Sequence, residues 1–317
     1  GEHEPARRYA TIAAKRAEDV FAYVDAAGYY ARALEAARSA PDVESAVIAP
    51  LQEAIADAWH RAGEYRKASD ANAEARKLVV GNRLAEARLL LKQSWIEEKL
   101  GKYPEALRWA ERAREALDGQ QGLEADRLMA STNAWYATVL QAQGRTAEAV
   151  EWAERAAREA EDVDDPEQMG AAYFVLGWAQ GAQGKEGAEA LMLKSLEAFR
   201  RSGNRVRQAN ALSNVGGVCY WEGRWEDALA YYERGRDESM KVGNLVNAAT
   251  SSMNIAEILT DRGEHAEAEA MLQKTLPVWK SSEYRYFQGA CHWMLGRVSL
   301  RAGRIDEALA RFDEARR

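Results

Sequence analysis

The sequence predicts an all-α fold, a right-handed superhelical solenoid of about eight helix–turn–helix repeats. Two patterns lead to this prediction: a glycine that recurs at a nearly constant interval, and apolar residues at helical spacing on either side of it. The composition agrees, because hydrophobic residues make up 47% of the chain and prolines number only six. The 317 residues also exceed the roughly 250–300 that one compact core supports, whereas a stacked array needs no central core.

The recurring glycine opens a short phrase that ends in alanine, as in residues 63–68, 101–106 and 223–228. A glycine can take the positive φ that ends one helix, and the residues after it begin the next. Each phrase therefore predicts the turn of a helix–turn–helix unit. The seven glycines, separated by 38 to 43 residues, are Gly63, Gly101, Gly144, Gly184, Gly223, Gly263 and Gly303.

The repeats divide the chain in order. Residues 1–40 are expected to form the first helix pair, in which Ala26, Tyr30 and Ala33 match the second half of a unit that lacks the turn glycine. Residues 41–317 are expected to hold seven further repeats of about 40 residues in one continuous solenoid.

The joints between units have their own signature. Residues 81–82, 203–204 and 243–244 are all Gly-Asn, a left-handed helix end followed by a residue that can begin the next helix. Residues 162–166, which contain three aspartates, are also expected to end one helix and begin the next. A calcium loop is the alternative for this segment, but it lacks the turn glycine and the terminal glutamate that such a loop needs.

These residues resemble the tetratricopeptide repeat family. The resemblance rests on a glycine within the first helix (Gly177, Gly216 and Gly296), the turn glycine, and an alanine–aromatic–alanine second helix. The usual period is about 34 residues, so a period near 40 implies longer helices. The resemblance predicts a scaffold and leaves the function open.

A narrower resemblance concerns residues 21–34, Trp279, Tyr284 and residues 295–304. Together with the Gly-Asn joints, they resemble the C-terminal arrays of large bacterial adenylate/guanylate cyclases and NTPase-linked regulators. The resemblance implies that this chain is a fragment of such a parent, first of all a class III nucleotide cyclase. The start at Gly1 and the repeat that breaks off at residues 311–317 also favour a fragment.

Composition and spacing argue against several classes of function. The net charge of −7 disfavours a nucleic-acid partner. Cys219 and Cys291 lack a CxxC partner, the four histidines lack ligand spacing, and no nucleophile motif is present. No apolar stretch approaches the length of a membrane span. We therefore expect a cytoplasmic, non-catalytic chain without cofactor or metal.

The resemblance places the first helix of each pair on the concave side, where a ligand groove is expected. Its aromatic candidates are Trp95, Trp135, Phe174, Trp178, Trp221 and Trp293, and its polar candidates are Asn214, Asn254, Glu257 and Arg297. Indole faces can stack on a ligand, and Asn214 and Asn254, 40 residues apart, can pair with an extended peptide. The alternative is that the aromatic residues fill gaps between long helices.

The leading hypothesis is a regulatory sensor module that binds a protein or peptide segment, including one from its own parent chain. One alternative is a small-molecule inducer sensor of an NTPase-linked transcription regulator. Another is a structural oligomerisation arm that forms a homodimer.

Overall fold

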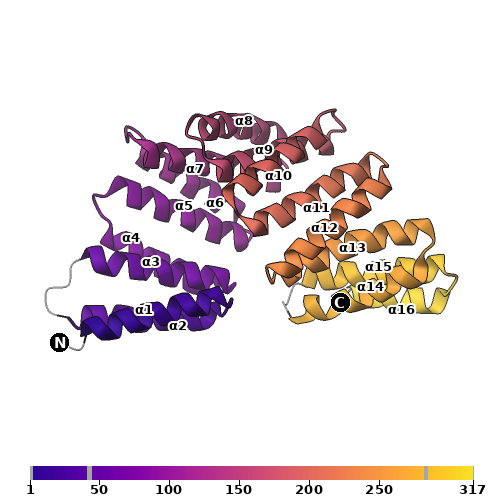
Figure 1. The fold of residues 1–317 in the computed structure, drawn as a ribbon, viewed down its shortest axis with the longest axis horizontal. Helices are drawn as coiled ribbons and strands as arrows, with labels where there is room; N and C mark the ends of the chain where they lie inside the picture. Colours follow the sequence, from indigo (N-terminus) through magenta and orange to yellow (C-terminus); the bar gives the residue numbers. More distant parts are fainter. Residues whose placement is uncertain (1–2, 41–44, 282–284, 317) are drawn as a thin grey trace. The chain divides into compact units, whose positions relative to one another are not determined.

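The computed structural model describes residues 3–40, 45–281 and 285–316. These residues form sixteen α-helices joined by turns, and no strand is found among them (Figure 1). The all-α repeat fold predicted from the sequence is confirmed, with eight helix pairs. Gly1, Tyr284 and Arg317 lie outside the described residues.

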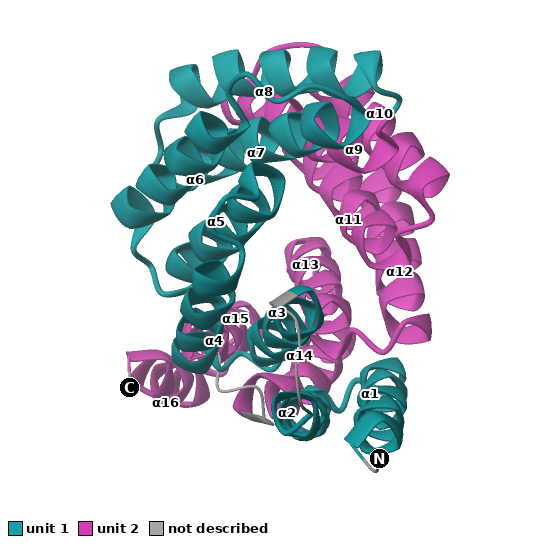
Figure 2. Ribbon diagram, turned by 90° about the vertical axis from the view of Figure 1, so that its left-hand side faces the viewer, with its two compact units in different colours: residues 1–164 teal, residues 165–317 magenta. Residues whose placement is uncertain are grey.

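The helices fall into two compact units, residues 1–164 and 165–317 (Figure 2). Unit 1 contains α1 (His3–Asp19), α2 (Tyr23–Arg38), α3 (Ser45–Arg61), α4 (Tyr65–Leu78), α5 (Arg83–Lys99), α6 (Tyr103–Leu117), α7 (Leu123–Ala142) and α8 (Thr146–Asp162). Unit 2 contains α9 (Pro166–Ala182), α10 (Ala188–Ser202), α11 (Arg205–Trp221), α12 (Trp225–Lys241), α13 (Leu245–Arg262), α14 (His265–Ser281), α15 (Arg285–Arg301) and α16 (Ile305–Arg316). Within each unit, every helix packs against the next one along the chain.

The turn inside each pair has the predicted geometry. All seven turn glycines have φ between +63° and +85°, a region that side chains disfavour. In the first pair, which lacks the glycine, Phe21 takes φ +61° instead. The shortened phrase after Gly184 is completed by Gly187, also left-handed, directly before α10 begins at Ala188.

The predicted joints between pairs are also present. Asn82, Asn204 and Asn244 precede α5, α11 and α13, and each carboxamide oxygen accepts a hydrogen bond from the backbone N–H three residues later, at 3.0–3.1 Å. Asp165 accepts from the N–H groups of Glu167 and Gln168 at the start of α9. These side chains satisfy N–H groups that have no partner within the helix.

Small residues let the two helices of a pair approach closely. The alanines after the turns, Ala68, Ala149, Ala228 and Ala308, are each at most 1% exposed. A Cβ added to Gly296 would lie 2.6 Å from the Phe312 ring, and one added to Gly177 would lie 3.1 Å from Met192. The glycines that carried the family resemblance are therefore packing residues.

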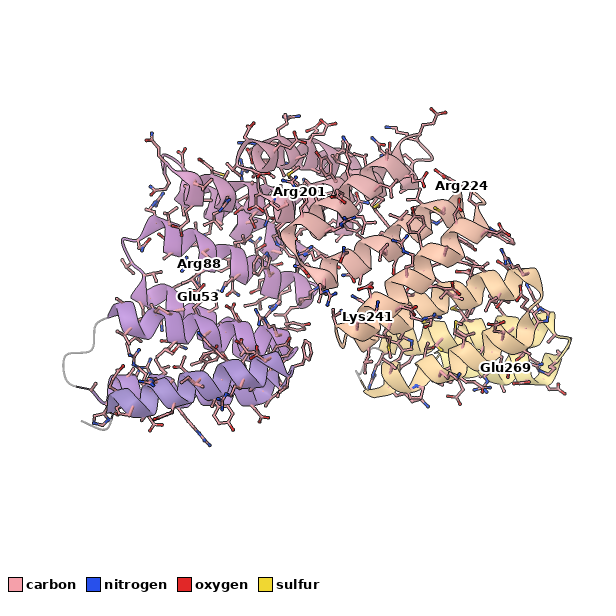
Figure 3. The ribbon with its side chains drawn as sticks, viewed as in Figure 1. Glu53, Arg88, Arg201, Arg224, Lys241 and Glu269 are labelled. Atoms are coloured by element: carbon pink, nitrogen blue, oxygen red, sulfur yellow. The ribbon has the colours of Figure 1, made fainter. Side chains whose placement is uncertain are left out.

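Arginines after two of the turns tie consecutive pairs together, and Figure 3 labels one residue of each contact, Arg224 and Glu269. Arg224, at the start of α12, reaches Glu189 of α10 at 2.8 Å. Arg304, at the start of α16, reaches Glu269 of α14 at 2.6 Å. Exposed ion pairs of this kind contribute little to stability individually, so the apolar core holds the pairs together.

Candidate binding surface

In unit 2 the first helices of consecutive pairs touch one another in order, α9 to α11 to α13 to α15. Ser213 of α11 and Ser251 of α13 share a hydrogen bond of 2.8 Å. Six of the residues that the sequence predicted to line the groove lie on these helices, at recurring positions of the repeat. We call this set the first-helix face of unit 2, and it consists of Trp178, Asn214, Trp221, Asn254, Glu257 and Arg297.

The α9–α11 end of this face is aromatic. The rings of Trp178 and Trp221 meet edge to face with centroids 5.2 Å apart, and the residues are 37% and 50% exposed. Trp221 rests on α9, because a Cβ added to Gly181 would lie 3.1 Å from its ring. Phe174, whose ring centroid is 6.3 Å from that of Trp178, is half-buried against the core. Two indoles thus remain accessible side by side.

The middle of the face carries two carboxamides. Asn214 on α11 and Asn254 on α13 are both half-buried. Among the described residues, neither side chain has a hydrogen-bond partner, whereas the nearby Asn210 and Asn247 bond to each other. A carboxamide with two donors and an acceptor available can pair with a peptide backbone.

The α13–α15 end is charged. The Arg297 guanidinium donates to Glu257 at 3.0 Å and to Asp261 at 3.2 Å, and it lies 5.0 Å from the centroid of the Trp293 ring. Arg301 is 3.1 Å from the same Asp261 carboxylate. Arg297 is therefore held in place by two acidic partners.

Trp293, the last aromatic candidate, lies on α15. It is 48% exposed and lines an open hollow of about 890 Å³ between α15 and α16, together with Tyr286, Leu309 and Phe312. The equivalent residue of the preceding pair, Met253, is 6% exposed and belongs to the core.

The two candidates in unit 1 mainly join helices. Trp95 of α5 and Trp135 of α7 meet edge to face at 6.2 Å, and both are half-buried against the core. The Trp135 Nε1–H donates to the Ser94 hydroxyl at 2.9 Å. The polar group of Trp135 is thus already paired, and the two indoles pack between α5 and α7.

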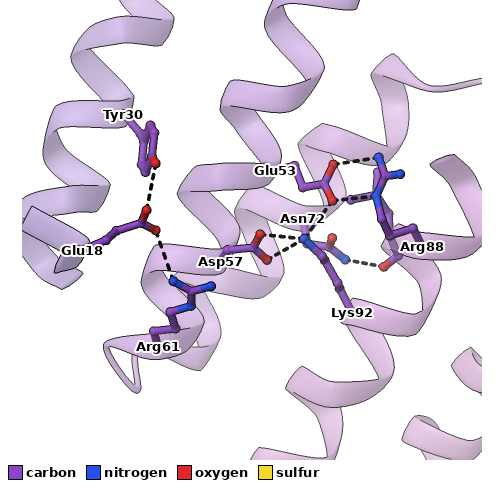
Figure 4. A network of polar contacts seen from close by, with 9 residues as sticks. Glu18, Tyr30, Glu53, Asp57, Arg61, Asn72, Arg88 and Lys92 are labelled. Carbon is purple, nitrogen blue, oxygen red and sulfur yellow. Dashed lines mark hydrogen bonds and ion pairs between the residues drawn. The ribbon is translucent and has the colours of Figure 1, made fainter. Parts of the chain in front are cut away.

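Sequence reasoning missed a charged network between α3 and α5 (Figure 4). Arg88 donates two hydrogen bonds to Glu53, at 2.9 and 3.1 Å, and Lys92 lies 2.8 Å from Glu53 and 2.6 Å from Asp57. Two acids four residues apart face two bases four residues apart, 35 residues later in the chain. This matched spacing of acids and bases in the sequence could have predicted the network.

The network sets the ionisation of Glu53. Burial opposes the charged form, but the hydrogen bonds from Arg88 and the charge of Lys92 outweigh it, so the pKa of Glu53 falls below its ordinary value of 4.5. Glu53 is thus a carboxylate at neutral pH, and the network is a fixed link between two repeats.

Reactive groups elsewhere are protected by burial. Burial raises the pKa of the Cys219 thiol to about 11 and also raises that of Cys291, so little thiolate forms at neutral pH. The described part of the chain contains no group of three or more His, Cys, Asp or Glu residues arranged to hold a metal ion. Among the described helices, none is long and apolar enough to cross a membrane.

Comparison with known families identifies tetratricopeptide repeats in two segments, residues 131–155 and residues 247–317. The first segment lies in unit 1 and the second in unit 2, so both units contain such repeats. No curated protein matches the sequence significantly.

Several solved structures share the fold. Aspartyl phosphate phosphatase F from Bacillus subtilis matches with 15% identity and a TM-score of 0.67 over 91% of this chain and 74% of its own. The Rap conjugation gene regulator of the plasmid pLS20, solved with the Phr* peptide, matches with 15% identity and a TM-score of 0.65 over 96% and 76%.

A third similar structure is a signal-transduction ATPase with numerous domains and a tetratricopeptide repeat sensor, from Pyrococcus horikoshii. It matches with 16% identity and a TM-score of 0.64 over all of this chain but only 47% of its own. At these identities the similarity establishes the fold and leaves the function to the residues of this chain.

Proposed function

We propose that this chain is a non-catalytic regulatory module that binds a protein or peptide segment on the first-helix face of unit 2. The observation that carries the proposal is the pair of unpartnered carboxamides, Asn214 and Asn254, one repeat apart on α11 and α13, on the face that also exposes the indoles of Trp178 and Trp221. Separate amide groups along an extended peptide can pair with the two carboxamides while its side chains cover the indoles.

The electrostatics of the face suit such a ligand. Arg297 is balanced by Glu257 and Asp261, so the face presents hydrogen-bonding groups without a large excess of one charge. Two of the similar structures add support, because one contains a bound peptide and another is described as a repeat sensor of a signalling ATPase.

The parent protein is part of the proposal. The Gly-Asn joints and residues 295–304 resemble the arrays attached to bacterial nucleotide cyclases, so we propose a class III cyclase as the effector. The similar ATPase favours the alternative, an NTPase-linked regulator that senses a small inducer. Reading the gene on both sides of this segment distinguishes the two.

A selection experiment tests the binding function. The purified chain is used to select from a phage-displayed library of random heptapeptides, and each selected peptide is titrated against wild type, Trp178→Ala and Trp221→Ala. The proposal predicts peptides whose affinity falls at least tenfold in both variants. Selected peptides that bind wild type and both variants equally would place binding elsewhere.

The exposed apolar residues of the last helix pair favour the oligomerisation alternative. Tyr286 is 80% exposed and Leu309 is 59% exposed beside the hollow of α15 and α16. Light scattering at rising protein concentration checks it: a dimer that Leu309→Asp abolishes would support the oligomerisation arm, and a monomer at all concentrations would exclude it.

A further inference from the structure

Two adjacent glycines in the middle of α11, Gly216 and Gly217, have different surroundings. A Cβ added to Gly216 would lie 2.9 and 3.0 Å from ring atoms of Tyr232, so close packing excludes a side chain there. A Cβ added to Gly217 would have only the Tyr232 hydroxyl within reach, at 3.7 Å, an ordinary contact. Glycine weakens a helix relative to alanine. Packing of the helices thus accounts for Gly216 and leaves Gly217 unexplained.

Gly217 belongs to the first-helix face of unit 2. It follows Trp178 by 39 residues and precedes Glu257 by 40, so it holds the equivalent position of the intervening repeat. Trp221 is one turn further along α11, and its ring packs on Gly181 of α9. We call the space left by the missing side chain the Gly217 gap. The equivalent positions of the neighbouring repeats hold Trp178 on α9 and Glu257 on α13.

The floor of the gap is the hydroxyl group of Tyr232. Tyr232 is 4% exposed, and among the described residues its hydroxyl has no hydrogen-bond partner. By contrast, the hydroxyl groups of two other buried tyrosines, Tyr30 and Tyr136, donate to Glu18 at 3.1 Å and to Glu111 at 2.8 Å. The Tyr232 hydroxyl is not one of the fully buried unpartnered atoms of the described residues, so it is accessible to an incoming group. A bound group that enters over Gly217 can supply that partner.

The groups around the gap are acceptors and aromatic faces. Glu257 uses Oε1 for Arg297, and its Oε2 has no partner in the described chain. Burial, and then the charge of Glu257, raise the pKa of Tyr232, so the hydroxyl stays protonated and keeps an acceptor lone pair. A flat cation rich in N–H donors would stack on an indole and donate to both oxygens.

We propose that the Gly217 gap is a specificity subsite for an arginine side chain of the bound segment. Its guanidinium would stack against Trp178 or Trp221 and donate to the Tyr232 hydroxyl and to Glu257. The inference rests on the proposed function, since it names the side chain that the same face selects.

A small probe tests the subsite without a peptide. With the tryptophans ¹⁵N-labelled, N-acetyl-arginine amide is titrated against the indole N–H signals of Trp178 and Trp221, which are assigned from Trp→Phe variants. N-acetyl-citrulline amide, neutral and of the same shape, is the matched probe. We expect the arginine probe to shift both signals with an affinity at least fivefold above that of the citrulline probe.

Two variants complete the test: Gly217→Leu fills the gap, and Tyr232→Phe removes only the floor hydroxyl. Each should lower the affinity for the arginine probe at least threefold. The control Tyr30→Phe, in unit 1, should leave that affinity unchanged. Equal binding of both probes, no shift with either probe, or full binding by Gly217→Leu would overturn the subsite. Selected peptides that need Asn214 and Asn254 but no arginine would overturn it while leaving the proposed function intact.

Discussion

The aromatic ring of Tyr232 on α12 lies directly against the backbone of Gly216 on α11, leaving less space than a methyl group needs. The hydroxyl of the same side chain lies below Gly217, where a methyl group fits. One tyrosine therefore makes two neighbouring glycines differ in their tolerance of a side chain.

Alanine substitutions of the two glycines should change stability in opposite directions. Gly216→Ala forces the Tyr232 ring to move, and we expect a loss of about 1–3 kcal/mol in the free energy of unfolding. Gly217→Ala should gain roughly 0.5–1 kcal/mol, because alanine favours the helix and meets no clash. Urea unfolding of both variants measures the difference. Equal losses would show that Gly217 also serves packing.

Ala228 provides a second test of packing between paired helices. It is fully buried at the start of α12, and its carbonyl oxygen would lie 3.2 Å from a Cβ on Gly216. Ala228→Leu should overpack this contact and cost about 1–3 kcal/mol. Ala230→Leu is the matched control, since Ala230 is exposed on the same helix. If the melting temperatures of the two variants agree, the assigned register of this pair is wrong.

The charged network of unit 1 should make stability depend on pH. The pKa of Glu53 is lowered in the folded state, so its contribution is fully present above the ordinary value of 4.5 and is lost as pH falls through the lower folded pKa. Glu53→Gln should cost about 1–3 kcal/mol at pH 7, because it weakens hydrogen bonds to charged partners.

The same variant should lose less stability than wild type on acidification. Thermal unfolding of both proteins between pH 7 and pH 3 measures this. Parallel curves would mean that the network does not couple Glu53 to folding.

Local chemistry made the fold predictable. Turn glycines and Asn82, Asn204 and Asn244 act within one or two turns of their own helix, so their identity and spacing suffice to place sixteen helices. The close approach at Gly216 was likewise predictable, because Gly216 lies in the apolar stripe of its helix, beside Leu212, Val215 and Cys219.

The exposure of individual side chains was less predictable. Asn214 and Asn254 are half-buried, and the Trp135 N–H donates a hydrogen bond to Ser94. Such details depend on how neighbouring repeats are offset, which one sequence does not reveal. The Gly217 gap was missed for a related reason, because glycine has no side chain whose chemistry could indicate a binding site in the sequence.

The account rests on Asn214 and Asn254 as ligand-facing residues, so the most direct measurement is the peptide affinity of Asn214→Ala and Asn254→Ala beside their free energies of unfolding. Because neither carboxamide has a partner within the described chain, we expect stability to change by no more than about 0.5 kcal/mol. Binding of a peptide selected on wild type should weaken by about 1–3 kcal/mol, since each substitution leaves a peptide group unpaired. Variants that unfold more easily yet bind with wild-type affinity would contradict the account and assign both residues to the core.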